Sequence, residues 1–114
     1  MILQRTIQNT VSTVGVGLHT GEKVKIILCP APEGHGVVFQ RDDITGQPKI
    51  TVNPEAVTET KLCSTLGTKD FSIATVEHLM SALSATGVDN ILVRLDGSEI
   101  PIMDGSAISF IHLI

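Results

Sequence analysis

The sequence predicts an α+β fold: a two-layer sandwich in which helices pack on one face of a mainly antiparallel sheet. Short runs rich in β-branched residues, separated by proline and glycine, fill the first half of the chain. A segment with the apolar spacing of an amphipathic helix follows them. A further strand and a further helix complete the chain. An order in which several strands are followed by a helix, a strand and a helix is typical of this fold class.

Four segments in the first half of the chain favour strands. Residues 24–28 alternate, so that three apolar side chains share one face. Proline and glycine follow, and residues 37–40 then predict a second strand in a hairpin-like arrangement with the first. Residues 50–52 form a short third strand. Residues 4–16 are rich in Thr and Val and supply one or two more.

The clearest helix signal runs from Thr75, a good N-cap residue, to Thr86, with Gly87 as its C-terminal stop. Apolar residues recur within it at i, i+3, i+4 and i+7, which gives one buried stripe. This stripe consists of Val76, Leu79, Met80 and Leu83. Residues 88–95 then read as a strand, and Ser106 opens a second helix.

The second helix is apolar nearly all round and reaches the last residue, Ile114, without a glycine stop or a basic residue in its final turn. A helix that is apolar on all sides is normally covered by more protein. We therefore interpret the end of the sequence as a fragment boundary.

Composition excludes several classes of protein. The chain of 114 residues is one domain by length and is long enough to bury a core, which must be built from Ile, Leu and Val because only three residues are aromatic. The net charge of −4, with no basic run, argues against a phosphate-reading nucleic-acid surface. Two cysteines do not make a secreted disulfide framework. No signal peptide or membrane span is present, so we expect a cytoplasmic protein.

Two adjacent residues, Glu77 and His78, carry the best chemical signal. Position 78 lies about 160° around the helix from the apolar stripe, on a face with Ser81, Ala82 and Ala85. A histidine beside small residues is expected to point into a cleft or open space. An imidazole that binds a metal, next to a carboxylate that accepts a proton from water, is the arrangement of zinc hydrolases. The simpler reading is that Glu77 interacts favourably with the helix dipole and His78 is a surface residue.

Two other segments stand out. Residues 15–21 read Gly-Val-Gly-Leu-His-Thr-Gly and contain His19, but they lack the lysine of a phosphate-binding P-loop. Residues 100–107 read Ile-Pro-Ile-Met-Asp-Gly-Ser-Ala, with a turn at Asp104-Gly105 and a helix cap at Ser106. This second segment is interpreted as a tightly specified crossing from strand to helix.

These two segments resemble one protein family when they are taken together with residues 75–79 (Thr-Val-Glu-His-Leu) and 87–90 (Gly-Val-Asp-Asn). The family is that of the UDP-3-O-acyl-N-acetylglucosamine deacetylases of lipid A biosynthesis. Order and spacing also match, and the likeness covers essentially all 114 residues.

The resemblance implies two similar domains with the active site between them. Residues 1–114 match the first domain, and the second is absent from this chain. Zn²⁺ is implied as the cofactor, held by His78 and by a histidine and an aspartate of the second domain, with Glu77 as general base. His19 matches a histidine near the substrate, and Leu62 and Cys63 match a segment that lines the acetyl end of the site. The substrate implied is UDP-3-O-acyl-N-acetylglucosamine, which is hydrolysed to a free amine and acetate.

Two alternatives remain open on the sequence alone. The first is a non-catalytic module that keeps the fold and binds a nucleotide sugar, in which case sugar binding needs no stoichiometric metal. The second is a structural or interaction protein, in which case a double variant at Glu77 and His78 changes no binding assay. Under the catalytic reading, the 114 residues alone are expected to be inactive because the second domain supplies two metal ligands.

Overall fold

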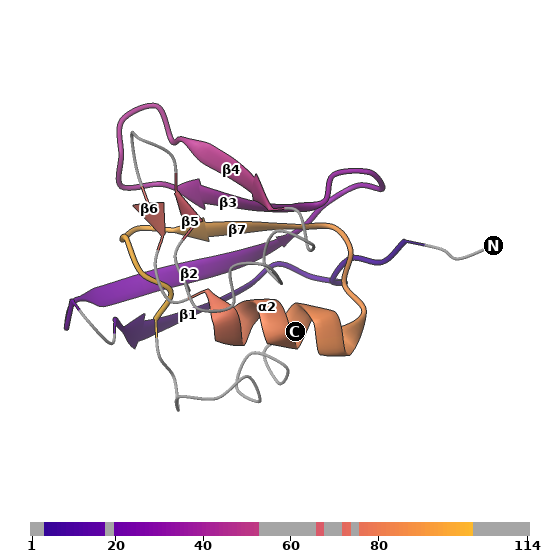
Figure 1. Cartoon of the computed structure of the whole chain (residues 1–114), viewed down its shortest axis with the longest axis horizontal. Coiled ribbons are helices and arrows are strands. Elements are labelled where there is room, and N and C mark those ends of the chain that lie inside the picture. The colour runs from indigo at the N-terminus through magenta and orange to yellow at the C-terminus, as the bar shows by residue number, and fades with distance from the viewer. Residues whose placement is uncertain (1–3, 18–19, 53–65, 68–71, 74–75, 102–114) are drawn as a thin grey trace.

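The computed structural model describes residues 4–17, 20–52, 66–67, 72–73 and 76–101. These residues form a five-stranded sheet with helix α2 (Glu77–Thr86) against one of its faces, and a separate two-stranded sheet (Figure 1). This is the two-layer α+β arrangement that the sequence predicts. The second helix, predicted to begin at Ser106, lies outside the described residues. No helix within the described ranges has the length and hydrophobicity needed to span a bilayer.

The five strands of the main sheet are β1 (Val11–Val16), β2 (Lys23–Pro30), β3 (Val37–Arg41), β4 (Lys49–Val52) and β7 (Ile91–Leu95). Their order across the sheet is β1-β2-β7-β3-β4. Neighbouring strands are antiparallel except β3 and β7, which are parallel. The separate pair consists of β5 (Leu66–Gly67) and β6 (Ser72–Ile73). The strands predicted in the first half of the chain are present, and residues 4–16 supply one strand.

The hairpin predicted between residues 24–28 and residues 37–40, which lie in β2 and β3, is wrong. β7 lies between β2 and β3 and pairs with both, so β2 and β3 are not neighbours. The physical reason is the burial of β7, in which Ile91, Val93 and Leu95 are each at most 1% exposed. A strand this apolar is most stable at the centre of a sheet, where both of its edges are paired. The order of strands along the sequence does not reveal that preference.

β7 also begins later than predicted, at Ile91 and not at Val88. The backbone N–H groups of Asp89 and Asn90 both donate to the carbonyl oxygen of Arg5, at 2.9 Å each, and are therefore not available to a neighbouring strand. The Arg5 N–H in turn donates to Asp89 Oδ2 at 3.0 Å. The buried Asn90 side chain accepts from the Gly36 N–H at 2.8 Å and donates to Gln4 Oε1 at 3.0 Å.

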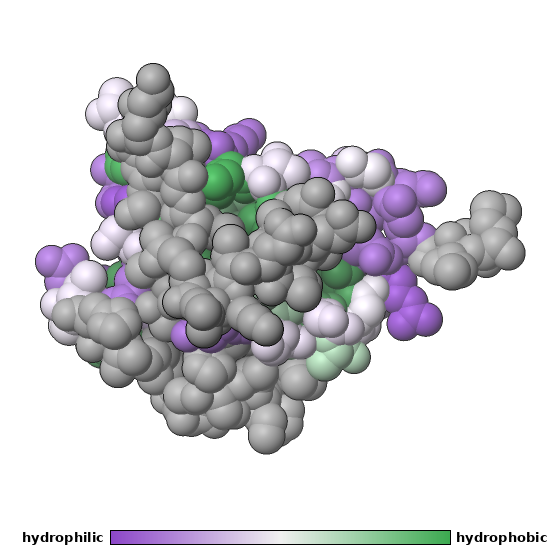
Figure 2. All heavy atoms as spheres, in the orientation of Figure 1, coloured by the Kyte–Doolittle hydropathy of each residue, from purple (hydrophilic) through white to green (hydrophobic). Residues whose placement is uncertain are grey.

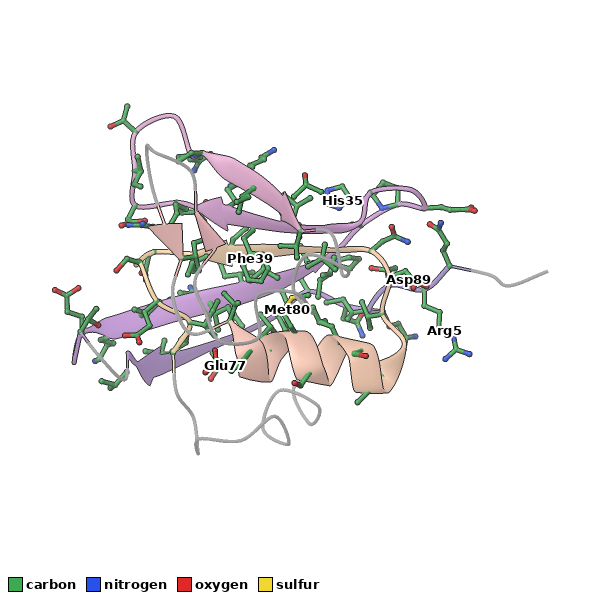
Figure 3. The ribbon with its side chains drawn as sticks, viewed as in Figure 1. Arg5, His35, Phe39, Glu77, Met80 and Asp89 are labelled. Atoms are coloured by element: carbon green, nitrogen blue, oxygen red, sulfur yellow. The ribbon has the colours of Figure 1, made fainter. Side chains whose placement is uncertain are left out.

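This network fixes the N-terminal segment at the end of the molecule beyond the C-terminal end of α2, where Figure 3 shows Arg5, Asp89 and His35. Hydrophilic residues gather at the same end in the space-filling view (Figure 2). The network is structural, because its hydrogen bonds join backbone and amide groups of three separate segments of the chain.

Helix α2 differs from its prediction at the N-terminus and matches it at the C-terminus. The N-cap is Val76 and not Thr75, and no side chain caps the helix. Val76 occupies this place because its carbonyl oxygen accepts the first helical hydrogen bond, from the Met80 N–H at 3.0 Å, while its side chain is buried in the core. Gly87 ends the helix in the left-handed conformation at φ 73°. The Val88 N–H donates to the Leu83 carbonyl at 3.0 Å, which completes a Schellman-type cap.

The core fills the space between α2 and the sheet. Leu79 and Leu83 from the helix belong to the same buried cluster as Ile26, Leu28 and Phe39 from the strands. The predicted apolar stripe of the helix is confirmed, with Met80 at its partly buried edge. The core residues are mainly Ile, Leu and Val, as the composition predicts.

A polar cluster follows the end of β3. Arg41 donates from Nε to Asp43 Oδ1 at 2.8 Å and from Nη2 to Asp43 Oδ2 at 2.6 Å. Next to this pair, Asp42 accepts from Arg94 Nε at 3.0 Å and from Gln40 Nε2 at 2.7 Å. The hydrogen bonds and charge of the Arg41 guanidinium hold the pKa of the Asp43 carboxyl below its ordinary value of 3.8, against a smaller opposing effect of burial.

Acid should therefore remove a small part of the stability, because the Asp43 pKa is lower in the folded chain than in the unfolded chain. Such a group stabilises the fold above its unfolded pKa, and the stabilisation is lost as the pH falls through the folded pKa. We expect Asp43→Asn to lower the free energy of unfolding at pH 7 by less than about 1 kcal/mol, because the pair is partly exposed and screened. The difference from wild type should shrink as the pH falls below about 3.8 and should vanish once the pH is below the folded pKa of Asp43.

Urea unfolding at pH 7, 5 and 3 measures this effect. Glu33→Gln, at an exposed carboxyl on the connection between β2 and β3, is the control. A difference between wild type and Asp43→Asn that stays constant from pH 7 to pH 3 contradicts the prediction.

Candidate active site

Glu77 is the first residue of α2 and its side chain is exposed. Figure 3 shows it at the N-terminal end of the helix, away from the polar network around Arg5 and Asp89. No other described residue holds the Glu77 carboxyl in a hydrogen bond or an ion pair. Its place in the first turn favours the negative charge, because the helix dipole is positive at that end. An accessible carboxyl group without a competing partner is what a general base requires.

His78 follows in the same turn. Its backbone is helical, and its side chain lies outside what the structure describes. Around the helix, position 78 is about 40° from Ala82 and about 60° from Ser81. Ala82 is fully buried in the core, whereas Ser81 and Ala85 are exposed.

One part of the sequence interpretation is therefore wrong, because the small residues near His78 do not all line open space. The buried arc of α2 is wider than the predicted stripe, since it includes Ala82. Alanine is small enough to pack against the sheet without breaking the layer, which is the reason that its burial is not visible in the spacing of large apolar residues. Position 78 lies at the boundary between the buried and the exposed arcs.

The other predicted site residues, His19, Leu62 and Cys63, lie outside the described residues. The structure does describe both sides of His19. The Gly17 N–H donates to the Glu22 carbonyl and the Gly21 N–H donates to the Gly17 carbonyl, both at 2.9 Å. These bonds close the turn between β1 and β2 that contains His19.

Glu99 touches this turn from a distant part of the chain. It follows β7, it is 1% exposed, and its Oε1 accepts from the Thr20 N–H at 3.2 Å. Ile100 and Pro101, the next two residues, are buried as well. The structure thus joins the beginning of the 100–107 motif to the 15–21 motif. Glu99 is not among the site residues predicted from the sequence, although the sequence does show a carboxyl residue directly before the apolar pair Ile100-Pro101.

No group of three or more His, Cys, Asp or Glu side chains in the described ranges is placed to hold a metal ion. The donor types at the start of α2 fit a zinc site only in part. The imidazole of His78 is a usual zinc ligand, and Glu77 is free of other described partners, so it can act on a water beside the metal. Catalytic zinc usually has three protein ligands, so a zinc site at the start of α2 would need further ligands from residues outside the described ranges.

A hollow of about 230 Å³ lies elsewhere, beside the C-terminal half of α2. Its lining consists of Val37, Met80, Leu83, Ser84, Gly87, Val88 and Asp89. This lining is mainly apolar and contains no histidine or cysteine. Its carboxylate, Asp89, already accepts a hydrogen bond from the Arg5 N–H. The hollow is at the opposite end of the helix from Glu77 and is therefore not the candidate catalytic site.

Comparison with known proteins gives a consistent result. A family model described as UDP-3-O-acyl N-acetylglycosamine deacetylase matches residues 4–114. The chain is 52% identical over 115 residues to the UDP-3-O-acyl-N-acetylglucosamine deacetylase of Colwellia psychrerythraea strain 34H. It is 53% identical over 114 residues to that of Stenotrophomonas maltophilia strain K279a, and 52% identical over 114 residues to that of Chromohalobacter salexigens.

In each comparison the whole of this chain is covered, and it spans 38% of the length of the relative. The family model covers nearly all of the chain, including the segments that hold Glu77, His78 and Glu99. The resemblance on which the sequence interpretation rests is thereby confirmed. This chain belongs to the UDP-3-O-acyl N-acetylglycosamine deacetylase family.

Proposed function

We propose that this chain is part of a zinc-dependent amidohydrolase that removes the N-acetyl group of UDP-3-O-(3-hydroxyacyl)-N-acetylglucosamine in lipid A biosynthesis. The observation that carries the proposal is the exposed Glu77 at the start of α2, directly before His78, within a chain that belongs to this deacetylase family. The relatives that it matches are named for that activity.

Within this proposal His78 is one of three protein ligands of the metal, and the others come from the part of the protein that corresponds to the remaining length of the relatives. Bound zinc would lower the pKa of a water molecule and polarise the acetyl carbonyl group. The Glu77 carboxylate accepts a proton from the attacking water while the water oxygen bonds to the carbonyl carbon. The C–N bond then breaks as the sugar nitrogen takes up the proton that Glu77 accepted, and the products are acetate and the free amine of the sugar.

The remaining residues of the proposed site act on the substrate. His19, in the turn between β1 and β2, would lie near the sugar, and Leu62 and Cys63 would line the acetyl end of the site. The cytoplasmic location expected from the sequence stays a prediction.

The direct test is an assay of acetate release from UDP-3-O-acyl-N-acetylglucosamine with the full-length protein, before and after removal of zinc by a chelator. We expect turnover that is lost with the metal and restored by stoichiometric Zn²⁺. We expect no turnover from the 114 residues alone at any zinc concentration, because the proposal places two of the three metal ligands outside them. Nucleotide-sugar binding by the full-length protein without metal and without acetate release would favour the binding-module alternative.

A further inference from the structure

The segment that follows β7 brings a carboxyl group into the interior. Glu99 is 1% exposed and is as fully buried as Ile100 beside it. A buried polar group costs free energy unless it is hydrogen-bonded, so a carboxyl in this position is retained for the bonds that it makes. One of these bonds is the 3.2 Å contact from the Thr20 N–H to Glu99 Oε1, which joins residues 79 positions apart.

Gly17 makes this contact possible. A Cβ atom at position 17 would overlap Glu99 Oε1 and would lie 2.5 Å from Thr20 Oγ1. The backbone of the turn can approach the carboxyl this closely only because residue 17 has no side chain. Position 17 of the 15–21 motif is therefore glycine for a specific reason, because the buried Glu99 carboxyl group approaches the backbone closely there.

The other hydrogen bonds that join described residues of the turn lie within residues 17–22. Besides the two backbone bonds between Gly17, Gly21 and Glu22, the Glu22 N–H donates to Thr20 Oγ1 at 3.2 Å. These bonds give the turn its shape but do not fix it relative to the rest of the sheet. The bond to Glu99 does, since Glu99 belongs to the segment after the central strand β7.

The location of this contact relates it to the candidate active site. Figure 1 shows the end of β1, the segment after β7 and the N-terminal end of α2 at the same end of the molecule. Thr20 is the residue directly after His19. The hydrogen bond from the Thr20 N–H to Glu99 therefore fixes the backbone directly on the C-terminal side of His19.

We propose that Glu99 is a positioning residue that fixes the turn between β1 and β2 at Thr20, the residue directly after His19, and so supports the binding of the UDP-sugar on this side of the candidate site. This inference rests on the proposed function, in which His19 lies on the substrate side of the site. Glu99 acts through Thr20 and does not itself touch the reacting atoms. Loss of Glu99 should therefore weaken the binding of the UDP-sugar more than it slows the chemical step.

Hydrogen exchange of the full-length protein tests the structural part. In Glu99→Ala, amide exchange across Thr20, Gly21 and Glu22 should become at least about tenfold faster, whereas exchange in the β2–β7 ladder should not change. Glu99→Gln keeps an oxygen acceptor at the same place and should exchange like wild type. Glu22→Ala, at an exposed carboxyl in the same turn, is the matched control and should leave exchange unchanged.

Steady-state kinetics tests the functional part. Glu99→Ala should raise KM for the UDP-sugar by about tenfold with kcat and zinc content little changed, and Glu99→Gln should restore KM. If Glu99→Ala does not fold, Gly17→Ala provides the second variant, because its Cβ would overlap both Glu99 Oε1 and Thr20 Oγ1, so that the contact between the carboxyl and the turn cannot keep its geometry.

Unchanged exchange at Thr20 in folded Glu99→Ala or Gly17→Ala would overturn the proposal, as would faster exchange with wild-type KM. The proposed function can fail separately. If wild-type protein with zinc does not release acetate, the deacetylase assignment is wrong, and the exchange measurement still decides whether Glu99 fixes the turn.

Discussion

Glu77→Ala in the full-length protein is expected to reduce the rate of deacetylation by roughly 10²–10⁴-fold, the usual contribution of a general base. The protein should keep its fold, because the Glu77 side chain is exposed and belongs to no part of the buried cluster. It should also keep its zinc, since the proposal gives Glu77 a role in proton transfer and none in metal binding. The only stability cost is the lost interaction with the helix dipole, about 0.3–1 kcal/mol.

Three measurements on the same samples separate these effects: kcat, zinc content by elemental analysis, and thermal unfolding. Glu77→Gln keeps the size and polarity of the side chain but cannot accept a proton, and should be nearly as slow as Glu77→Ala. Ser84→Ala, at an exposed position two turns further along α2, is the matched control and should be fully active. If zinc is lost from Glu77→Ala and activity falls only in proportion, Glu77 is a metal ligand and the role proposed for it is wrong.

The parts of the fold that could be predicted are those specified by local pattern. The alternation of Val24, Ile26 and Leu28 is enough to place β2, because side chains of a strand point to opposite faces in turn. Gly87 is enough to end α2, because the left-handed conformation at the end of a helix favours glycine. Both features depend only on neighbouring residues.

Two of the features that were predicted wrongly, both in the sheet, depend on contacts between distant segments. Whether β2 pairs with β3 or with β7 is decided by burial across the whole sheet. The late start of β7 depends on Arg5, more than eighty residues earlier, which accepts the two N–H groups that would otherwise extend the strand. No pattern within residues 88–95 contains that information.

In the candidate site, too, the residues that could be predicted are those specified by local pattern. Glu77 and His78 could be selected because they are adjacent on one helix and their chemistry is complementary. Glu99 could not be selected in that way, since its contact with Thr20 spans the chain from the first strand connection to the segment after the last described strand. Gly17 was recognised as part of a motif, but its physical reason became visible only with the position of the Glu99 carboxyl.

His78→Ala in the full-length protein is expected to lower zinc affinity by at least about 100-fold. Loss of an outer residue that only orients a ligand already costs roughly 10–100-fold, and loss of one of three protein ligands should cost more. The helix itself should survive, because alanine has a higher helix propensity than histidine. Deacetylase activity should therefore disappear with the metal while the thermal unfolding midpoint of the metal-free protein stays the same.

The measurement is a competition titration with a zinc chelator on metal-free wild type, His78→Ala and His35→Ala. His35 is the matched control because it lies at the opposite end of the molecule, where Nδ1 is 3.0 Å from the Gly36 carbonyl oxygen (Figure 3). Excess Zn²⁺ should restore part of the activity of His78→Ala if only affinity is reduced, and none if the imidazole also sets the position of the metal beside Glu77. Wild-type zinc affinity together with full activity in His78→Ala would remove His78 from the metal site. The metal would then have to be held by other residues, and Glu77, as the neighbour of His78, would lose the reason for its assignment as the base.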